Sequence, residues 1–240
     1  MVLSRPRLRK GLSIFGRPYF FRAFVRHRVA ASSEHLEAIR FCAANTLIDV
    51  GANKGQFSLA FRSLRPGAGI FAFEPLPSEA DVYDDVFADD LQARLTRVAL
   101  GAEAGSAQFH VADRADSSSL LKPGLGQARA FGVRSETEIA VDVKRLDDCI
   151  DLGELEHPIL LKADVQGAEL LVFDGCSGLE NVDYIYVELS FVELYNGQPL
   201  FHEVTSYLTE RGFIIAGIYN QVSTKEYGPT QVDALFRRRN

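Results

Sequence analysis

The chain has 240 residues, of which 47% are hydrophobic and 24% charged, the balance of a soluble globular protein with one substantial core. No stretch approaches the roughly eighteen uncharged apolar residues that a membrane-spanning helix requires, which excludes an integral membrane protein. The net charge is −6. The three cysteines, Cys42, Cys149 and Cys176, contain no C-x-x-C pair, which argues against a zinc site or a disulfide framework. This use of cysteine predicts a reducing, cytoplasmic location.

The first thirty residues differ in charge from the rest of the chain. They hold eight Arg or Lys and no acid, so the remainder carries a formal charge of −14. A basic leader of this kind is compatible with contact with nucleic acid, a membrane surface or a partner, but a solvated arm or a short helix packed on the domain is favoured. Arg17 and Arg22 interrupt the apolar run that a signal peptide needs. We expect a basic arm or helix over residues 1–33 and one domain over residues 34–240, with the oligomeric state left open.

From Thr46 onward, short apolar runs alternate with segments of helical spacing. This alternation is typical of a parallel sheet that helices cover on both faces, which makes its strands uniformly apolar. In chain order the predicted elements are strand 46–51, helix 57–64, strand 69–74, helix 79–90 with Ser78 as its N-cap, strand 95–101, strands 158–165 and 184–190, helix 201–208, and strands 213–219 and 232–238.

One block interrupts the alternation. Residues 107–113 and 137–146 show the period of two that half-buried strands have, and the stretch between them, residues 117–132, is loop-rich with no strong helix. We therefore predict a β-hairpin or lid inserted at about residues 102–150. The last apolar run follows its predecessor through Gly228-Pro229, which predicts a closing hairpin.

The turn after the first strand reads D-V-G-A-N-K-G-Q-F, starting at Asp49. Gly51 and Gly55 let the backbone turn tightly and approach a ligand at the start of the next helix. A P-loop would need Lys where Gln56 stands, and a dinucleotide motif would need Gly where Asn53 stands. Asp49 would also repel a phosphate group. The turn therefore favours a positively charged ligand without phosphate.

The second strand ends in Glu74, where a Rossmann-like fold places the acid that binds ribose hydroxyls. A ribose without phosphate indicates an adenosine-type cofactor. S-adenosylmethionine meets each condition, since it combines adenosine, a sulfonium cation and an amino-acid tail. The structural alternative is that Asp49 caps a helix and Glu74 begins a turn before Pro75.

Taken in order, several segments resemble the FkbM-type S-adenosylmethionine-dependent methyltransferases: LIDVGANKGQFS, FAFEPLPSE, RVALG, SSSLL, VKRLDD, LLKADVQGAELLVFDG and YIYVELSFVELYNGQPLFHEV. The resemblance covers about Glu34 to Phe236. It implies a Rossmann-like class I methyltransferase fold, α/β, with a seven-stranded, mostly parallel sheet whose last strand is antiparallel. It also implies methyl transfer to a hydroxyl of a small molecule or sugar in a biosynthetic pathway. The residues expected to bind the cofactor are Asp49, Gly51, Asn53, Gly55, Phe57, Glu74, Ala99 and Asp164.

Transfer to a hydroxyl needs a positioned acceptor and a group that removes its proton. Asp164 and Glu188 end the two strands next to the expected methyl group, and His202 follows in the next helix, so these three are the catalytic candidates. The alternative for the two acids is a helix cap or an ion pair with Lys162. A divalent cation is less favoured, because no tight acidic cluster completes a ligand set. The candidate substrate contacts are Ser118, Ser119, Tyr195 and Gln198.

Two rival functions stay open. One is a catalytically silent binding or scaffold domain that docks a partner through the Arg-rich leader. The other is an NAD-dependent oxidoreductase, which the missing central glycine of the turn disfavours. A nucleic-acid methyltransferase would need a basic face, which only the leader supplies, so we expect a small-molecule or carbohydrate acceptor.

Overall fold

The computed structural model describes residues 18–239. The start of the predicted basic arm, and with it the predicted contact with a membrane surface, lies outside the described residues. A seven-stranded sheet has the order β3-β2-β1-β7-β8-β10-β9, and β10 runs antiparallel to both of its neighbours. This confirms the predicted sheet and its closing hairpin. The strands are β1 (Thr46–Val50), β2 (Gly69–Phe73), β3 (Ala93–Thr96), β7 (Ile159–Ala163), β8 (Tyr184–Ser190), β9 (Phe213–Thr224) and β10 (Gly228–Arg238).

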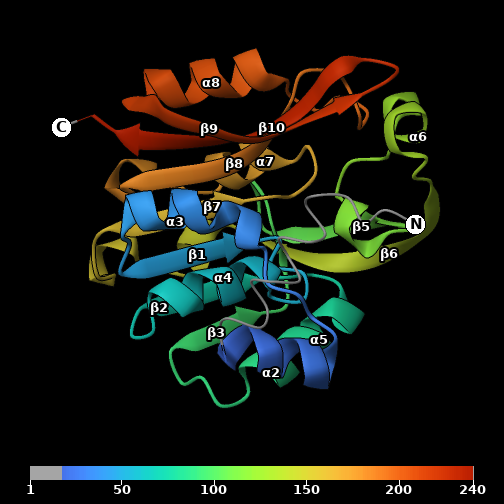
Figure 1. Ribbon diagram of the computed structural model, residues 1–240. Helices are drawn as coiled ribbons and strands as arrows, with labels where there is room; N and C mark the ends of the chain where they lie inside the picture. The colour runs from blue at the N-terminus through green and yellow to red at the C-terminus, as the bar shows by residue number, and fades with distance from the viewer. Residues whose placement is uncertain (1–17, 240) are drawn as a thin grey trace.

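Helices cover both faces of this sheet (Figure 1). Leu47 packs with the helices of one face and its neighbour Ile48 with those of the other, as the alternation of side chains along a strand requires. Every residue of β1 and β7 is buried, which explains their mostly apolar character. One face carries α2 (Pro18–His27), α3 (Leu36–Cys42), α4 (Gln56–Leu64) and α5 (Pro77–Phe87), and the other carries α7 (Glu169–Asp174) and α8 (Phe201–Glu210).

A second, three-stranded sheet has the order β4-β6-β5 and lies beyond the carboxyl end of β1 (Figure 1). It consists of β4 (Ala99–Leu100), β5 (Gly105–Ala112) and β6 (Ser135–Lys144). Since β5 and β6 pair antiparallel, the predicted hairpin is confirmed. The short 3-10 helices of the described chain are η1 (Ser33–His35), η2 (Ala115–Ser117), η3 (Leu146–Asp148), η4 (Leu152–Glu154) and η5 (Leu179–Asn181).

Three local predictions are wrong. The predicted strand 95–101 is two strands, because the chain turns at Val98, whose N–H donates to the carbonyl of Thr96 at 3.0 Å, and β4 then pairs with β6. Ser78 lies inside α5, which begins at Pro77 because the fixed φ of proline suits the first helical position. The loop-rich stretch contains a helix, α6 (Leu125–Phe131), whose seven residues are too few to show a period.

The register of the central strands sets up the site. Val50, the last residue of β1, pairs with Phe73 of β2 and with Ala163 of β7. Ala163 in turn pairs with Val187 of β8. The carboxyl ends of four parallel strands therefore lie at one edge, which is where open α/β sheets bind ligands.

Candidate active site

A cavity of about 510 Å³ lies at this edge, a volume typical of small-molecule sites. Glu74 follows β2, Asp164 follows β7, and Glu188 lies near the end of β8, and all three line the cavity. Residues from segments 28–35 and 115–120 complete its wall. The insert and the start of the described chain thus enclose the edge of the sheet.

The turn after β1 lies in direct contact with the end of β7. Gly51 has a φ of +71°, and a Cβ atom there would lie 2.0 Å from the carbonyl oxygen of Asp164, so only glycine fits. Asn53 also has a positive φ, of 48°, a conformation that Asn adopts more readily than most residues. Its N–H then donates to Glu74 Oε2 at 2.8 Å. The turn therefore connects the ends of β1, β2 and β7.

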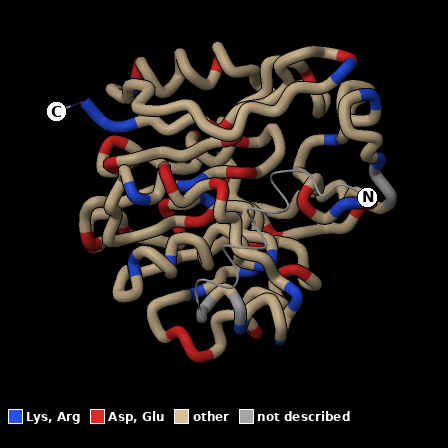
Figure 2. Tube along the Cα trace, viewed as in Figure 1, with Lys and Arg blue, Asp and Glu red and all other residues tan. Residues whose placement is uncertain are grey.

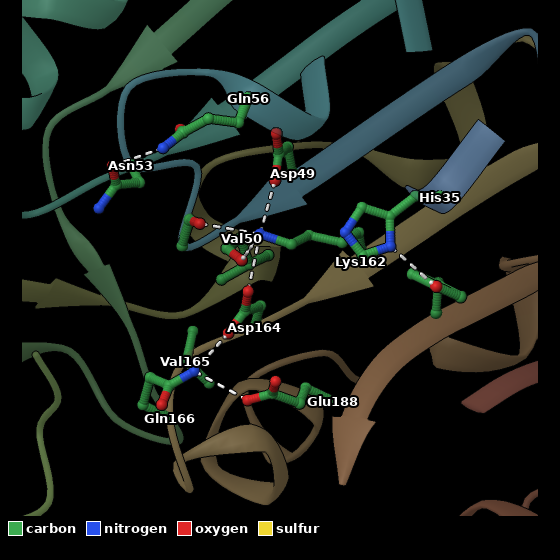
Figure 3. A network of polar contacts seen from close by, with 12 residues as sticks. His35, Asp49, Val50, Asn53, Gln56, Lys162, Asp164, Val165, Gln166 and Glu188 are labelled. Carbon is green, nitrogen blue, oxygen red and sulfur yellow. Dashed lines mark hydrogen bonds and ion pairs between the residues drawn. The ribbon is translucent and has the colours of Figure 1, made fainter. Parts of the chain in front are cut away.

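Beneath this turn, Asp49 and Lys162 form a buried ion pair. Lys162 Nζ lies 3.0 Å from Asp49 Oδ1 and donates to the carbonyl oxygens of Val50, at 3.2 Å, and Gly51, at 2.8 Å (Figure 3). Burial alone would lower the pKa of Lys162, but the neighbouring Asp49 and Asp164 raise it above its usual value. The buried lysine is thus a fixed positive charge that holds the turn.

Glu74 is a buried carboxylate held by backbone groups. Its Oε2 accepts from Asn53 N–H, and its Oε1 accepts from Leu76 N–H at 2.9 Å. Burial raises the pKa of Glu74 to about 7. Since a carboxylate oxygen accepts more than one hydrogen bond, both oxygens keep capacity for hydroxyl donors from a ligand.

The amide of Gln166 joins the other two acids. Gln166 Nε2 donates to Asp164 Oδ1 at 2.8 Å and to Glu188 Oε2 at 2.9 Å (Figure 3). Gln231 Nε2 also donates to Glu188 Oε2, at 2.8 Å. Burial, together with Asp164, Asp233 and Glu169, raises the pKa of Glu188 well above its usual value. Asp164 is the more accessible acid, with 42% of its side chain exposed.

Most of the candidates from the sequence meet in this cavity. The residues of the predicted set that line it are Gly51, Asn53, Phe57, Glu74, Ala99, Ser118, Asp164 and Glu188.

The other candidates lie outside the cavity wall. Asp49 is fully buried beneath the turn, and Gly55, with a φ of +86°, packs against α5. Ser119 donates to the carbonyl oxygens of Val165 and Gln166, which fastens the insert to the β7–α7 loop. The substrate candidate Tyr195 is buried and donates to Gln166 Oε1 at 2.9 Å. The substrate candidate Gln198 accepts from the N–H groups of Leu194 and Tyr195. The third catalytic candidate, His202, is exposed on α8.

Several cavity residues were not among the candidates. Lys162 lies in β7 and Gln166 follows that strand, and the neighbouring candidate Asp164 was a signal for both. His35, Tyr186 and Asp233 also line the cavity, but they come from η1, β8 and β10, so no sequence spacing relates them.

The acids of the cavity do not gather as metal ligands. Among residues 18–239, no three His, Cys, Asp or Glu side chains lie close enough together to hold a metal ion. In the same part of the chain no helix has the length and apolarity to cross a membrane.

The model of the methyltransferase FkbM domain matches residues 49–215. The 2-O-methyltransferase NoeI of Sinorhizobium fredii is 33% identical over 160 residues, which cover 63% of this chain and 66% of NoeI. The hexuronic acid methyltransferase AglP of Haloferax volcanii is 26% identical over 71% of this chain and 70% of its own. Magnesium protoporphyrin IX methyltransferase of Synechocystis, solved with bound S-adenosylmethionine, is similar over 94% of this chain and 96% of its own, with 12% identity and a TM-score of 0.47.

Proposed function

The chain belongs to the FkbM methyltransferase family and is a methyltransferase, and from that premise we propose that it methylates a hydroxyl oxygen with S-adenosylmethionine as donor. The proposed acceptor is a sugar or a similar small polyhydroxylated molecule. The observation that carries the proposal is the distribution of acids along the cavity, with Glu74 at the β2 end and Asp164, Glu188 and Asp233 toward the β8–β10 end.

The β2 end fits the adenosine part of the donor. Glu74 is fixed by two backbone N–H groups and accepts further hydrogen bonds from ribose hydroxyls. Phe57 and Ala99 line the same cavity and supply apolar contacts. A phosphate would meet the charges of Glu74 and Asp164, so the site suits a nucleoside without phosphate.

The remaining end of the cavity is left for the acceptor. Asp164 and Glu188 are held by the Gln166 amide, so they accept hydrogen bonds from acceptor hydroxyls in a fixed geometry. When bound, S-adenosylmethionine supplies an electrophilic methyl group on a sulfonium. The carboxylate of Asp164 is placed to stabilise positive charge there and to orient the hydroxyl oxygen.

The relatives and the surface charge support a carbohydrate acceptor over a nucleic acid. Two relatives are named for 2-O-methylation and for methylation of a hexuronic acid. Lys and Arg positions are scattered among acidic positions along the described chain in the view of Figure 2. A nucleic acid would require a concentrated basic surface.

The test is methyl transfer from S-adenosylmethionine with an isotope-labelled methyl group to methyl α-D-glucopyranoside and to D-glucuronic acid. We expect a labelled methoxy signal on the sugar by NMR. Asp164→Asn should lower the turnover number about a hundredfold, because a positioned charge is lost at the reacting centre. Asp85→Asn changes an exposed carboxylate of α5 and should leave turnover unchanged.

The outcomes separate the parts of the proposal. If the protein binds S-adenosylmethionine but methylates only an amine or carbon acceptor, then the hydroxyl acceptor is wrong. If calorimetry detects no binding of S-adenosylmethionine or its demethylated product to the folded protein, then the proposed cofactor is wrong.

A further inference from the structure

Three residues from distant parts of the chain form a hydrogen-bonded cluster in the acceptor part of the cavity. His35 Nδ1 lies 2.9 Å from the Tyr186 hydroxyl, which donates to Asp233 Oδ2 at 3.0 Å. His35 Nδ1 also lies 3.3 Å from Asp233 Oδ2. Asn220 Nδ2 donates to the same carboxylate oxygen at 2.8 Å. His35, Tyr186 and Asp233 line the cavity wall.

The ring of His35 is held in place on two sides. It packs against Phe57, with the ring centroids 5.3 Å apart, and edge-on against Tyr186, with centroids 5.5 Å apart. The backbone before it is tied to α4, because Ser32 N–H donates to the carbonyl of Gln56 at 3.1 Å. His35 is therefore a positioned side chain, with 19% of its surface exposed.

Counting protons in the cluster assigns the tautomer of His35. The Tyr186 hydroxyl has one proton, and the carboxylate of Asp233 can only accept, so that proton goes to Asp233. Burial and the nearby Asp233 raise the pKa of Tyr186, which keeps this proton on the hydroxyl. The tyrosine oxygen is then the acceptor, and the proton between it and the imidazole belongs to Nδ1, because a lone pair on Nδ1 would face Asp233 Oδ2 at 3.3 Å. Asn220 Nδ2 lies 3.2 Å from Nδ1, but it donates to Asp233 at the shorter distance of 2.8 Å.

The other ring nitrogen carries the lone pair. Nε2 of His35 has no hydrogen-bond partner among residues 18–239. A neutral imidazole with Nδ1–H bound to a tyrosine–carboxylate pair is a base in a fixed orientation, and the carboxylate stabilises the imidazolium that forms. The ionisable groups that share the cavity wall around it are Arg28, Glu34, Glu74, Asp116, Lys54, Lys162, Asp164, Tyr186, Glu188 and Asp233.

We propose that His35 is the general base of the methyl transfer and that Tyr186 and Asp233 are its positioning residues, an inference that rests on the proposed function. Nε2 takes the proton of the acceptor hydroxyl while the acceptor oxygen bonds to the methyl carbon. The electron pair of the broken carbon–sulfur bond goes to sulfur. His35 then releases its proton to solvent, so protons and electrons balance.

The first test reads the tautomer without any acceptor. In protein with isotope-labelled histidine nitrogens, NMR should show neutral His35 protonated on Nδ1, with the signal assigned by its loss in His35→Asn. The double variant Tyr186→Phe, Asp233→Ala should shift the ring toward the Nε2–H tautomer, because both acceptors of the Nδ1 proton are then gone. A wild-type ring protonated on Nε2 would overturn the inference.

The second test is kinetic, with the two sugar probes named above. His35→Asn keeps an amide near the position of Nδ1 and removes Nε2, so the turnover number should fall about 10²–10⁴-fold while the affinity for S-adenosylhomocysteine stays the same. Added imidazole should restore part of the rate. The pH–rate profile of the wild type should have an acid limb that His35→Asn lacks. His157→Asn, at an exposed position just before β7, is the matched control.

Failure of the inference and failure of the proposed function give different results. Equal turnover and equal pH profiles for wild type and His35→Asn would overturn the role of His35 and leave the methyltransferase proposal standing. A wild-type protein that binds no cofactor would overturn the proposed function, whatever tautomer NMR reports.

Discussion

Glu74 shows how a single buried acid can tie cofactor binding to pH. Its two oxygens accept from backbone N–H groups, yet burial raises its pKa to about 7. At neutral pH the side chain is therefore divided between the protonated and ionised forms. Ribose hydroxyls donate more strongly to the ionised form.

The affinity for S-adenosylhomocysteine should therefore rise with pH. We expect calorimetry to give binding about tenfold weaker at pH 6 than at pH 8, because the folded protein must lose the Glu74 proton before the ligand binds. Glu74→Gln should bind more weakly and lose this pH dependence. Glu154→Gln, at an exposed position of η4, should behave as wild type. A wild-type affinity independent of pH would show that Glu74 does not contact the ligand.

The sequence predicted individual site residues where a motif carried them. Glu74 and Asp164 end apolar strands, and the order of parallel strands brings their ends together. Asp49 is the last residue but one of β1, and its side chain contacts Ser58 and Lys162 instead of the cavity, because it forms an ion pair with the buried lysine. His35 was not predicted as a site residue, because its partners lie 151 and 198 positions away in the chain and form no motif.

At the scale of elements, the contact between the turn after β1 and the end of β7 determines the shape of the site. Gly51 has a positive φ, and its Cα lies against the carbonyl of Asp164. Any side chain at position 51 would push β1 and β7 apart where the cavity begins.

Gly51→Ala should therefore destabilise the fold by at least about 1–3 kcal/mol through backbone strain, with a further cost from the steric clash, and should abolish cofactor binding. Gly67→Ala is the matched control, because a Cβ there meets no atom within 4 Å. Its free energy of unfolding should change by no more than about 1 kcal/mol. Urea unfolding of both variants measures the difference, and equal stabilities would contradict the proposed close contact.

The elements themselves were largely predictable. Mostly apolar runs marked β1, β2, β7 and β8, since strands covered on both faces have few polar positions. The division of 95–101 into β3 and β4 was not predictable, because Arg97 and Val98, which lie between the two strands, are not typical turn residues. The strands differ in their partners, since β3 pairs with β2 and β4 pairs with β6. The seven residues of α6 gave no helical period, and its end is set by Gly132, with a φ of 72°.

For the whole molecule, three buried glutamates link stability to pH. Burial raises the pKa of Glu74 and of Glu169 to about 7 and that of Glu188 well above its usual value. Glu169 accepts from the N–H of Gly167 at 3.0 Å, so the buried carboxylate holds the β7–α7 loop in place. Between pH 4.5, the usual value for glutamate, and pH 7, the folded chain keeps protons that the unfolded chain has lost.

These glutamates should therefore lower the free energy of unfolding as the pH rises through that window. Each of Glu74 and Glu169 contributes a loss of roughly 3 kcal/mol. We expect the double variant Glu74→Gln, Glu169→Gln to lose less stability than wild type between pH 5 and pH 7, measured by urea unfolding. Parallel pH curves for the two proteins would contradict the assigned pKa shifts.

The central claim is that the cavity holds an adenosine cofactor with its ribose at Glu74 and leaves the β8–β10 end to a hydroxylated acceptor. The most direct measurement is a crystal structure of the protein with S-adenosylhomocysteine. We predict the ribose hydroxyls within hydrogen-bond distance of Glu74, the adenine near Ala99 and the sulfur directed toward Asp164. A nucleoside bound among His35, Glu188 and Asp233, or outside the cavity, would contradict the claim.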